Sequence, residues 1–265
     1  MSTHAPAVIT GATGTLGRAV SQAFAHREVP LVLVGRSRPK LEALARELAV
    51  KTDLVVADLG DVQEVKRAAK EIAFVAPVIG VLVNNAAVFH RQRVDRGGLE
   101  EMFATNHLAG FILTTLLQPQ LVAGRAHVIN VTAPSSTRLD FDDLQWSKHY
   151  SALSAFGASK AANLLFSFEA ARQLKGTGVT VDAFHPGLMK SGLMKEAPWF
   201  IRAMMKLVAA SGQKAAEALV EAALAPGVDG QGRFLKSGVP SAPPASTLDV
   251  KAQKRLWDVS RQLAS

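Results

Sequence analysis

Three glycines near the N-terminus have a spacing that suits a phosphate-binding turn. Gly11, Gly14 and Gly17 stand three residues apart and follow an apolar, β-branched run. After a β-strand, such glycines allow a tight turn and let the backbone approach a pyrophosphate, whose charge sits on free N–H groups at the start of the next helix. The stretch from Ala7 to Arg18 therefore predicts a dinucleotide site, although a glycine triplet alone also fits a simple turn.

The position of this turn favours the binding interpretation. After it, apolar residues recur at helical spacing, which predicts a helix directly behind the glycines. These residues are Leu16, Ala19, Val20, Ala23 and Phe24.

A second candidate binding residue follows the next apolar run. Leu31 to Gly35 has strand length and no polar residue, as expected for a parallel strand covered on both faces, and Arg36 comes next. In a doubly wound fold this place meets the adenosine ribose, where an acidic side chain favours a free 2′-hydroxyl and an arginine accommodates a 2′-phosphate. Arg36 therefore favours NADP(H) over NAD(H). The alternative is a surface arginine beside a helix whose N-cap is Ser37.

Strand-like and helical segments alternate along the chain that carries these residues. This alternation predicts a parallel sheet with right-handed crossovers, whose ligands bind at the carboxyl ends of the strands. Gly11, Arg36, Asp58 and Asn84 all fall at such ends. The further helical segments are Pro39 to Ala49 and Asp61 to Ala73, and the further strands are Asp53 to Leu59 and Ile79 to Ala87.

Length and composition limit the possible classes of protein. A chain of 265 residues suits one α/β domain, spanning 1–265, and no apolar run is long enough to cross a bilayer. The net charge of +8 comes from scattered Lys and Arg residues without the aromatic residues of a nucleic-acid surface. We read these charges mainly as solvated faces, some of which could contact a phosphate-bearing cofactor.

The same composition sets expectations for metals and location. Cysteine is absent, which excludes disulfides and thiolate metal sites, and the histidines show no ligand spacing. The N-terminus has no secretory pattern, so the default location is the cytoplasm. We expect no metal site and no nucleic-acid partner.

Several motifs, in order along essentially the whole chain, resemble the short-chain dehydrogenase/reductase family. TGATGTLG resembles its cofactor turn, Asp58-Leu59 its adenine contact, and Asn84 to Ala87 its Asn-Asn-Ala-Gly motif. The remaining matches are closest to the retinol-dehydrogenase-like subgroup. They are Phe103 to Thr114, resembling its long fourth helix, FDDLQWSKHYSALSAFGASKAANLL, resembling its loop and fifth helix, Val179 to Ser191, resembling its sixth strand and Pro-Gly turn, and Arg255 to Ser260, resembling its C-terminal helix.

The resemblance implies a single-domain, Rossmann-type doubly wound parallel sheet of about seven strands with helices on both faces. It also implies a small apolar substrate under a lid at 188–212 and, by analogy, a homodimer formed through the fourth and fifth helices. Thr15, Ala87 and Ser191 depart from the family pattern, but backbone contact with the phosphates should survive. The cofactor-binding positions implied are Gly11, Thr13, Gly14, Thr15, Leu16, Gly17, Arg36, Asp58, Leu59, Asn85, Ala86, Lys160, Pro186, Gly187 and Ser191.

The family's reaction moves a hydride between a nicotinamide and a carbonyl or alcohol carbon, while a tyrosine transfers the proton. A tyrosine pKa near about 10 must be lowered for this role, which a lysine one helical turn away does. On this sequence the lysine is Lys160 and the active-site asparagine is Asn106, but Phe156 replaces the tyrosine and Ala133 the serine that would contact the substrate oxygen. Two of the four catalytic positions therefore lack the oxygen that the mechanism needs.

Two hypotheses follow from this site. The first is an NADP(H)-binding protein with a degenerate centre and weak or no activity on ordinary carbonyls. The second is an active NADP-dependent oxidoreductase with unusual proton donors or an already activated hydride acceptor. The side chains that could serve as donors are Tyr150, Thr132, Ser135, Ser136 and His185, although alternation along the strand points Thr132 away from Ala133.

Overall fold

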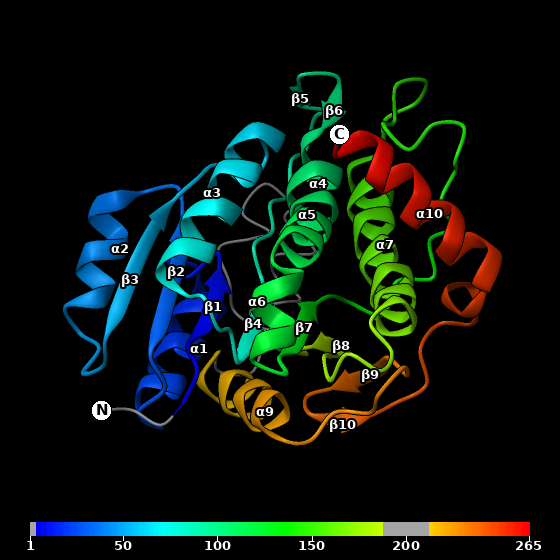
Figure 1. Ribbon diagram of the computed structural model, residues 1–265. Helices are drawn as coiled ribbons and strands as arrows, with labels where there is room; N and C mark the ends of the chain where they lie inside the picture. Colours follow the sequence, from blue (N-terminus) through cyan, green and yellow to red (C-terminus); the bar gives the residue numbers. More distant parts are fainter. Residues whose placement is uncertain (1–3, 188–211) are drawn as a thin grey trace.

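The computed structural model describes residues 4–187 and 212–265, which build one mixed sheet between two layers of helices (Figure 1). The sheet has eight strands in the order β10-β9-β8-β7-β4-β1-β2-β3. All neighbours are parallel except β10 and β9. The strands are β1 (Ala7–Thr10), β2 (Leu31–Gly35), β3 (Thr52–Val56), β4 (Val81–Asn84), β7 (His127–Val131), β8 (Thr180–His185), β9 (Arg233–Lys236) and β10 (Val239–Pro240).

The Rossmann-type fold is confirmed, but the expectation of about seven strands was wrong by one. The additional strand is β10, which pairs antiparallel with β9 so that Val239 faces Lys236. Between them, Ser237 and Gly238 both have positive φ, 49° and 86°. Two such residues form the tight hairpin turn whose twist matches that of the strands. A two-residue strand is too short to leave a periodic signal in the sequence.

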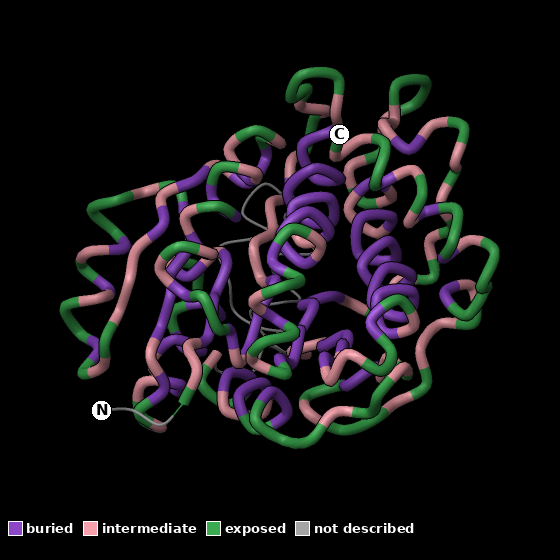
Figure 2. Tube along the Cα trace, viewed as in Figure 1, coloured by how far each residue is buried: buried purple, intermediate pink, exposed green. Residues whose placement is uncertain are grey.

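Helices cover both faces of the sheet, as expected. One face packs on α1 (Thr15–Ala25), α2 (Arg38–Ala45) and α9 (Gly212–Leu224), and the other on α3 (Val62–Val75), α5 (Ala109–Leu116) and α7 (Ala152–Gln173). Figure 2 shows the buried residues concentrated in the strands and on the inward sides of these helices. The two apolar layers fix the sheet from both sides, so that the strand ends form a stable edge for a site.

The described residues contain several further elements. The segment from Glu101 to Leu116 is helical throughout but has a π-helical insertion, which the sequence did not predict. These elements are α4 (Glu101–Phe103), the π-helix η1 (Ala104–Leu108), α6 (Gln118–Ala123), the hairpin strands β5 (Asp95–Arg96) and β6 (Leu99–Glu100), the 3₁₀-helix η2 (Ala245–Leu248) and α10 (Val250–Leu263).

The C-terminal helix α10 packs on α5 and α7. The Trp257 ring lies edge-on to Phe111, with centroids 5.0 Å apart, and stacks on Phe166 at 6.0 Å. His107 Nε2 lies 2.9 Å from the Ser260 hydroxyl oxygen. Burial lowers the pKa of His107 to about 4, so its ring is neutral at pH 7. His107 is thus a packed helix residue.

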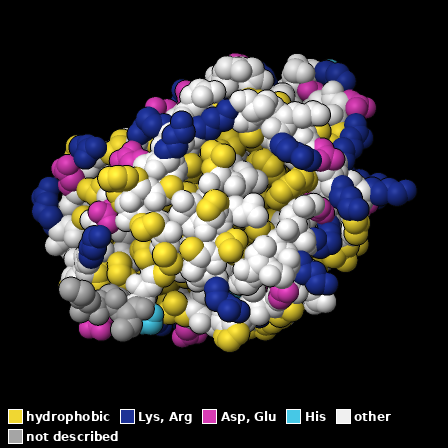
Figure 3. Space-filling model, in the orientation of Figure 1, with side chains coloured by type: hydrophobic (Ala, Val, Ile, Leu, Met, Phe, Trp, Pro, Cys, Tyr) yellow, Lys and Arg dark blue, Asp and Glu magenta, His cyan; other side chains and the backbone are white. Residues whose placement is uncertain are grey.

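The surface carries its charges in small groups. On the face in Figure 3, Lys and Arg side chains lie mostly around the rim together with Asp and Glu, and the centre contains many apolar side chains. Within 4–187 and 212–265, no helix has both the length and the apolar character that crossing a bilayer requires.

The glycine turn between β1 and α1 depends on close backbone contact. Gly11 has a φ of +62°, and the Gly14 N–H donates to the Gly11 carbonyl over 3.0 Å. A Cβ on Gly17 would lie 2.2 Å from the Gly11 carbonyl oxygen. Only glycine at position 17 lets the first turn of α1 approach the end of β1.

We expect Gly17→Ala to destabilise the protein by roughly 1–3 kcal/mol, the usual cost of forcing an extra carbon into a packed site. Gly14→Ala is the matched control, because its Cβ would meet the Gly11 carbonyl oxygen at 3.3 Å and nothing else within 4 Å. Urea unfolding measures both variants. Equal midpoints for the two variants would contradict this account of the turn.

Candidate active site

The carboxyl ends of β1 and β4 meet at the glycine turn. The Asn85 side-chain amide donates to the Thr10 carbonyl over 2.9 Å and to the Gly11 carbonyl over 3.3 Å. In return, the Thr10 hydroxyl oxygen accepts the backbone N–H groups of Asn85 and Ala86 over 2.9 and 3.0 Å. The turn is therefore held from one side by β4.

The start of α1 offers unpaired N–H groups beside this turn. The N-cap is Gly14, which has no capping side chain, and the first turn of α1 contains no acidic residue. The first N–H groups of a helix have no partner within it and attract anions. These N–H groups suit a phosphate at the positions where Gly11, Thr13, Gly14 and Thr15 are expected to bind one, while Leu16 is buried at 6% exposure.

Arg36 follows β2 at the same edge and is exposed. Next to it, Ser37 takes the N-cap position of α2, but its side chain makes no capping hydrogen bond. In the described part of the chain, neither Arg36 nor the Ser37 hydroxyl has a polar side-chain partner, so both are available to a ligand.

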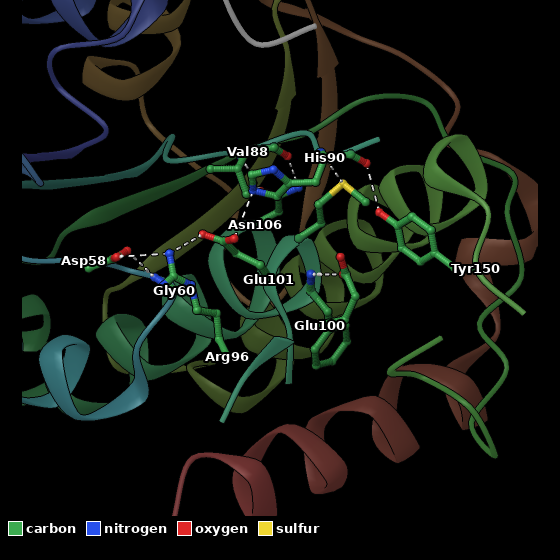
Figure 4. A network of polar contacts seen from close by, with 11 residues as sticks. Asp58, Gly60, Val88, His90, Arg96, Glu100, Glu101, Asn106 and Tyr150 are labelled. Atoms are coloured by element: carbon green, nitrogen blue, oxygen red, sulfur yellow. Dashed lines mark hydrogen bonds and ion pairs between the residues drawn. The ribbon is translucent and has the colours of Figure 1, made fainter. Parts of the chain in front are cut away.

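A polar network connects the end of β3 with the loop after β4 (Figure 4). Asp58 accepts the Gly60 N–H over 3.1 Å, and Arg96 lies 3.7 Å from Asp58 and 3.1 Å from Glu101. Glu101, only 3% exposed, also lies 3.1 Å from His90 Nε2. Asp58 was expected to contact adenine, whereas sequence reasoning missed its partners because Arg96 lies in a distant hairpin.

Asn106 is the polar centre of the site. Its side chain accepts the Val88 N–H over 2.7 Å, donates to the Val88 carbonyl over 3.1 Å and donates to the Ser159 hydroxyl over 3.0 Å. The backbone carbonyl of Asn106 accepts a hydrogen bond from the Asn163 side-chain amide over 2.8 Å. Asn106 thus connects the loop after β4 with α7 through hydrogen bonds. The residue lies in the π-helical segment, a feature common at functional sites.

Lys160 and Phe156 lie one turn apart on α7 and face each other. The Lys160 Nζ is 5.5 Å from the centroid of the Phe156 ring, and Lys160 is only 5% exposed. Burial lowers the pKa of Lys160 to about 8. Within the described ranges no carboxylate pairs with Lys160, and its ammonium group lies over the face of the Phe156 ring.

The end of β7 approaches the same helix. The Thr132 hydroxyl donates to the Lys160 carbonyl over 2.7 Å, so it faces the helix backbone and is already engaged. Ala133, which follows, is half-buried and carries no polar atom on its side chain. His185 Nδ1 lies 3.4 Å from the Thr132 carbonyl, and burial lowers the pKa of His185.

Two of the expected substitute donors have clear positions. The Tyr150 hydroxyl donates to the His90 carbonyl over 2.9 Å, so it is engaged in holding the loop after β4. Ser135 Oγ lies 3.1 Å from the Thr137 hydroxyl oxygen. Sequence reasoning did not single out Thr137, because only the fold brings it against α7.

The other expected positions are placed as follows. Leu59 is buried at 5% exposure, and Pro186 and Gly187 follow β8 at the edge of the sheet that carries the site. Ser191 and the expected lid, apart from Gly212, lie outside the described residues. Within the described residues, no group of three or more His, Cys, Asp or Glu side chains could hold a metal ion.

Comparison with known proteins matches this arrangement to one family. A family model described as short chain dehydrogenase covers residues 5–199. The chain belongs to the short-chain dehydrogenase family. It is 33% identical to dehydrogenase/reductase SDR family member 13 of Bos taurus, over 97% of this chain and 72% of that protein. It is 31% identical to human retinol dehydrogenase 12, over 97% of this chain and 85% of that protein. The resemblance to the retinol-dehydrogenase-like subgroup is therefore confirmed.

Several solved structures share the fold. An uncharacterised protein from Mycobacterium paratuberculosis has a TM-score of 0.81 at 28% identity, covering 98% of this chain and 92% of its own. A metagenomic short-chain oxidoreductase in complex with NADP has a TM-score of 0.66 at 21% identity, covering 91% of this chain and 99% of its own. The 3-ketoacyl-(acyl-carrier-protein) reductase of Brucella melitensis complexed with NADH has a TM-score of 0.70 at 20% identity, covering 89% of this chain and 99% of its own. The last two likenesses show the fold alone.

The burial of Lys160 leads to a stability prediction. Its pKa is lowered from 10.5 to about 8, so at pH 7 the fold holds a charge that burial disfavours. We expect Lys160→Met to stabilise the protein without ligand by about 3 kcal/mol at pH 7, because one pKa unit corresponds to about 1.4 kcal/mol. The gain should shrink as the pH rises from about 8 towards 10.5, because the native lysine is then neutral and the lysine of the unfolded chain loses its charge as well.

Urea unfolding at several pH values measures this effect. Lys70→Met is the matched control, because Lys70 is exposed on α3 and should change stability little. Destabilisation of the Lys160→Met variant at pH 7 would contradict the account of this lysine.

Proposed function

We propose that this short-chain dehydrogenase binds a nicotinamide dinucleotide, prefers NADP(H), and transfers hydride only weakly to ordinary carbonyl compounds. The observation that carries the proposal is the turn of α7 on which Lys160 faces the Phe156 ring and no phenol hydroxyl. Ala133 at the end of β7 likewise offers no oxygen. Groups suited to binding a cofactor are thus present, while two groups that would contact the substrate oxygen are missing.

The glycine turn fits the pyrophosphate of such a cofactor. A Cβ on Gly11 would lie 2.9 Å from the Ala86 Cα, so a larger residue at position 11 would push the turn away from the end of β4. When bound, a nicotinamide dinucleotide supplies hydride chemistry, which side chains cannot provide. The N–H groups at the start of α1 would hold the pyrophosphate, and Lys160 the nicotinamide ribose, as family membership suggests. The relatives bound to NADP and to NADH support the dinucleotide without favouring either form.

The preference for NADP(H) rests on the end of β2. Arg36 is exposed where a 2′-phosphate would lie, and the Ser37 hydroxyl is not used to cap α2. The free N–H groups at the start of α2 add to the attraction for a phosphate. Position 36 does not carry the acidic residue that would bind a ribose 2′-hydroxyl.

The weak activity follows from the size of the missing contributions. A positioned acid or base contributes roughly 10²–10⁴ to a rate, and one oxyanion donor roughly 10²–10³. These losses do not simply multiply, because members of a catalytic unit act together. Loss of the larger contribution alone would already make reduction of an unactivated carbonyl slow.

The proposal also includes a ligand and an assembly. The cluster of Phe89, Phe156 and Met102 gives the site an apolar wall, which suits a small apolar molecule.

A homodimer formed on the faces of α5 and α7 would have to include α10, because Trp257 packs between these helices. Location in the cytoplasm stays an expectation.

We expect Arg36→Ala to weaken NADPH binding about 10–100-fold, the value of one hydrogen bond to a charged group, and to leave NADH binding nearly unchanged. Arg46→Ala removes the same charge at the other end of α2 and serves as the control. Fluorescence titration with each cofactor measures the affinities. An equal loss for NADPH and NADH would contradict the assignment of Arg36 to the 2′-phosphate.

Restoring the two missing oxygens tests the active centre. We expect Ala133→Ser combined with Phe156→Tyr to raise NADPH-dependent reduction of small apolar aldehydes by at least about 10²-fold, the usual contribution of a positioned proton donor. Each single variant should gain far less, and Lys160→Met in the double variant should remove the gain. A folded, NADPH-binding double variant without added activity would contradict this placement of the tetrad.

A further inference from the structure

The loop after β7 carries two hydroxyl groups that form a closed pair. The Ser135 N–H donates to the Ala133 carbonyl over 2.7 Å, which turns the chain back directly after the strand. The Ser135 hydroxyl donates to the Thr137 hydroxyl oxygen over 3.1 Å and accepts the Thr137 N–H over 3.3 Å. The position of each hydroxyl is therefore fixed by the other residue.

This pair lies directly against the helix that carries Phe156 and Lys160. A Cβ on Gly157 would lie 2.5 Å from the Thr137 hydroxyl oxygen and 3.2 Å from that of Ser135. Successive helix residues turn by about 100°, so position 157 lies about 60° from position 160 on one side and position 156 about 40° from it on the other side. The Thr137 hydroxyl therefore flanks the helix face of Lys160 on the side opposite Phe156, and a ligand over Lys160 could contact both.

The hydroxyl proton of Thr137 is available to a ligand. Its oxygen accepts from Ser135, and among the described residues no group accepts its own proton. A hydroxyl that already accepts a hydrogen bond is a better donor, because neighbouring hydrogen bonds polarise each other. Both residues are half-buried, so a ligand could reach the pair.

The apolar wall beside the pair is rich in aromatic rings. The Phe89 and Phe156 rings meet edge to face with centroids 5.6 Å apart, and Trp146 packs against the same cluster. Flat aromatic molecules pack favourably against such rings. Together, the wall and the hydroxyl pair suit an aromatic ring that carries a carbonyl group.

We propose that Thr137, supported by Ser135, donates a hydrogen bond to the carbonyl oxygen of an aromatic aldehyde bound against Phe156. This proposal rests on the proposed function, because the hydride must come from bound NADPH. The carbonyl carbon gains a hydride with its two electrons as a C–H bond of the dihydronicotinamide breaks, and the nicotinamide is oxidised. The oxygen gains a proton from water through the Thr137 hydroxyl. A neutral hydroxyl stabilises an alkoxide only modestly, so electron-poor aldehydes are the favoured substrates.

Infrared spectroscopy of bound 4-nitrobenzaldehyde, labelled with carbon-13 at the carbonyl, tests the hydrogen bond directly. The full chain is measured with NADP⁺, which cannot donate hydride, and again without cofactor. We expect a carbonyl stretch at lower frequency in the native protein and in Thr137→Ser, which keeps the hydroxyl. The shift should be absent in Thr137→Val, which keeps the shape, and unchanged in the control Ser136→Ala, which alters the exposed neighbouring serine.

Turnover with NADPH provides the second measurement. We expect Thr137→Val to lower kcat/KM for 4-nitrobenzaldehyde about 10²-fold, as for loss of one oxyanion donor, with NADPH affinity unchanged. Thr137→Ser should keep most of the activity. Gly157→Ala tests the same hydroxyl from α7. We expect a similar loss of kcat/KM, because the added Cβ would displace the Thr137 hydroxyl.

The outcomes separate the two proposals. Failure to bind NADPH would contradict the proposed function, while the infrared shift without cofactor would still report on Thr137. A carbonyl frequency that is the same in the native protein and in Thr137→Val would overturn the inference about the hydroxyl pair. So would NADPH binding with no reduction of 4-nitrobenzaldehyde, or equal kcat/KM in the native protein and Thr137→Val.

Discussion

The hydrogen bonds of Asn106 hold together three parts of the chain that are far apart in sequence. Its side chain binds both backbone groups of Val88 and the Ser159 hydroxyl, and its carbonyl binds Asn163. A buried amide whose donors and acceptors are all used fixes its neighbours more strictly than apolar contact does. The loop after β4 and the helix α7 therefore keep their relative positions, and the side chains that these two elements present to the candidate substrate depend on this connection.

Under the proposed function, this constraint explains how the site keeps its shape with Phe156 and Ala133 at the positions of the reacting hydroxyls. The frame consists of buried amides and backbone groups, among them Asn85 at the glycine turn, and none of them needs Tyr or Ser at positions 156 and 133. Phe156 instead contributes packing, because its ring joins Phe89 and Met102 in a separate apolar cluster. In this protein, the residues that shape the site and those that would move a proton are different sets.

Much of the fold could be predicted from the sequence because its signals are local. The glycine turn, the buried strands and the alternation of strands and helices all leave short-range patterns. The strand β10, the ion pairs of Arg96 and the contact of Thr137 with Gly157 could not be predicted. Each depends on a turn of two residues or on partners that only the folded sheet brings together.

The packing of α10 has a consequence for how the protein forms during synthesis. His107 and Ser260, which meet in this interface, are separated by 153 positions in the sequence. Contacts of such long range form late, because the intervening chain must first be ordered. The helix that carries Lys160 thus receives its outer cover only when residues around Trp257 have left the ribosome. Until then the aromatic rings of α5 and α7 stay exposed, and a chaperone that binds apolar surface would find them there.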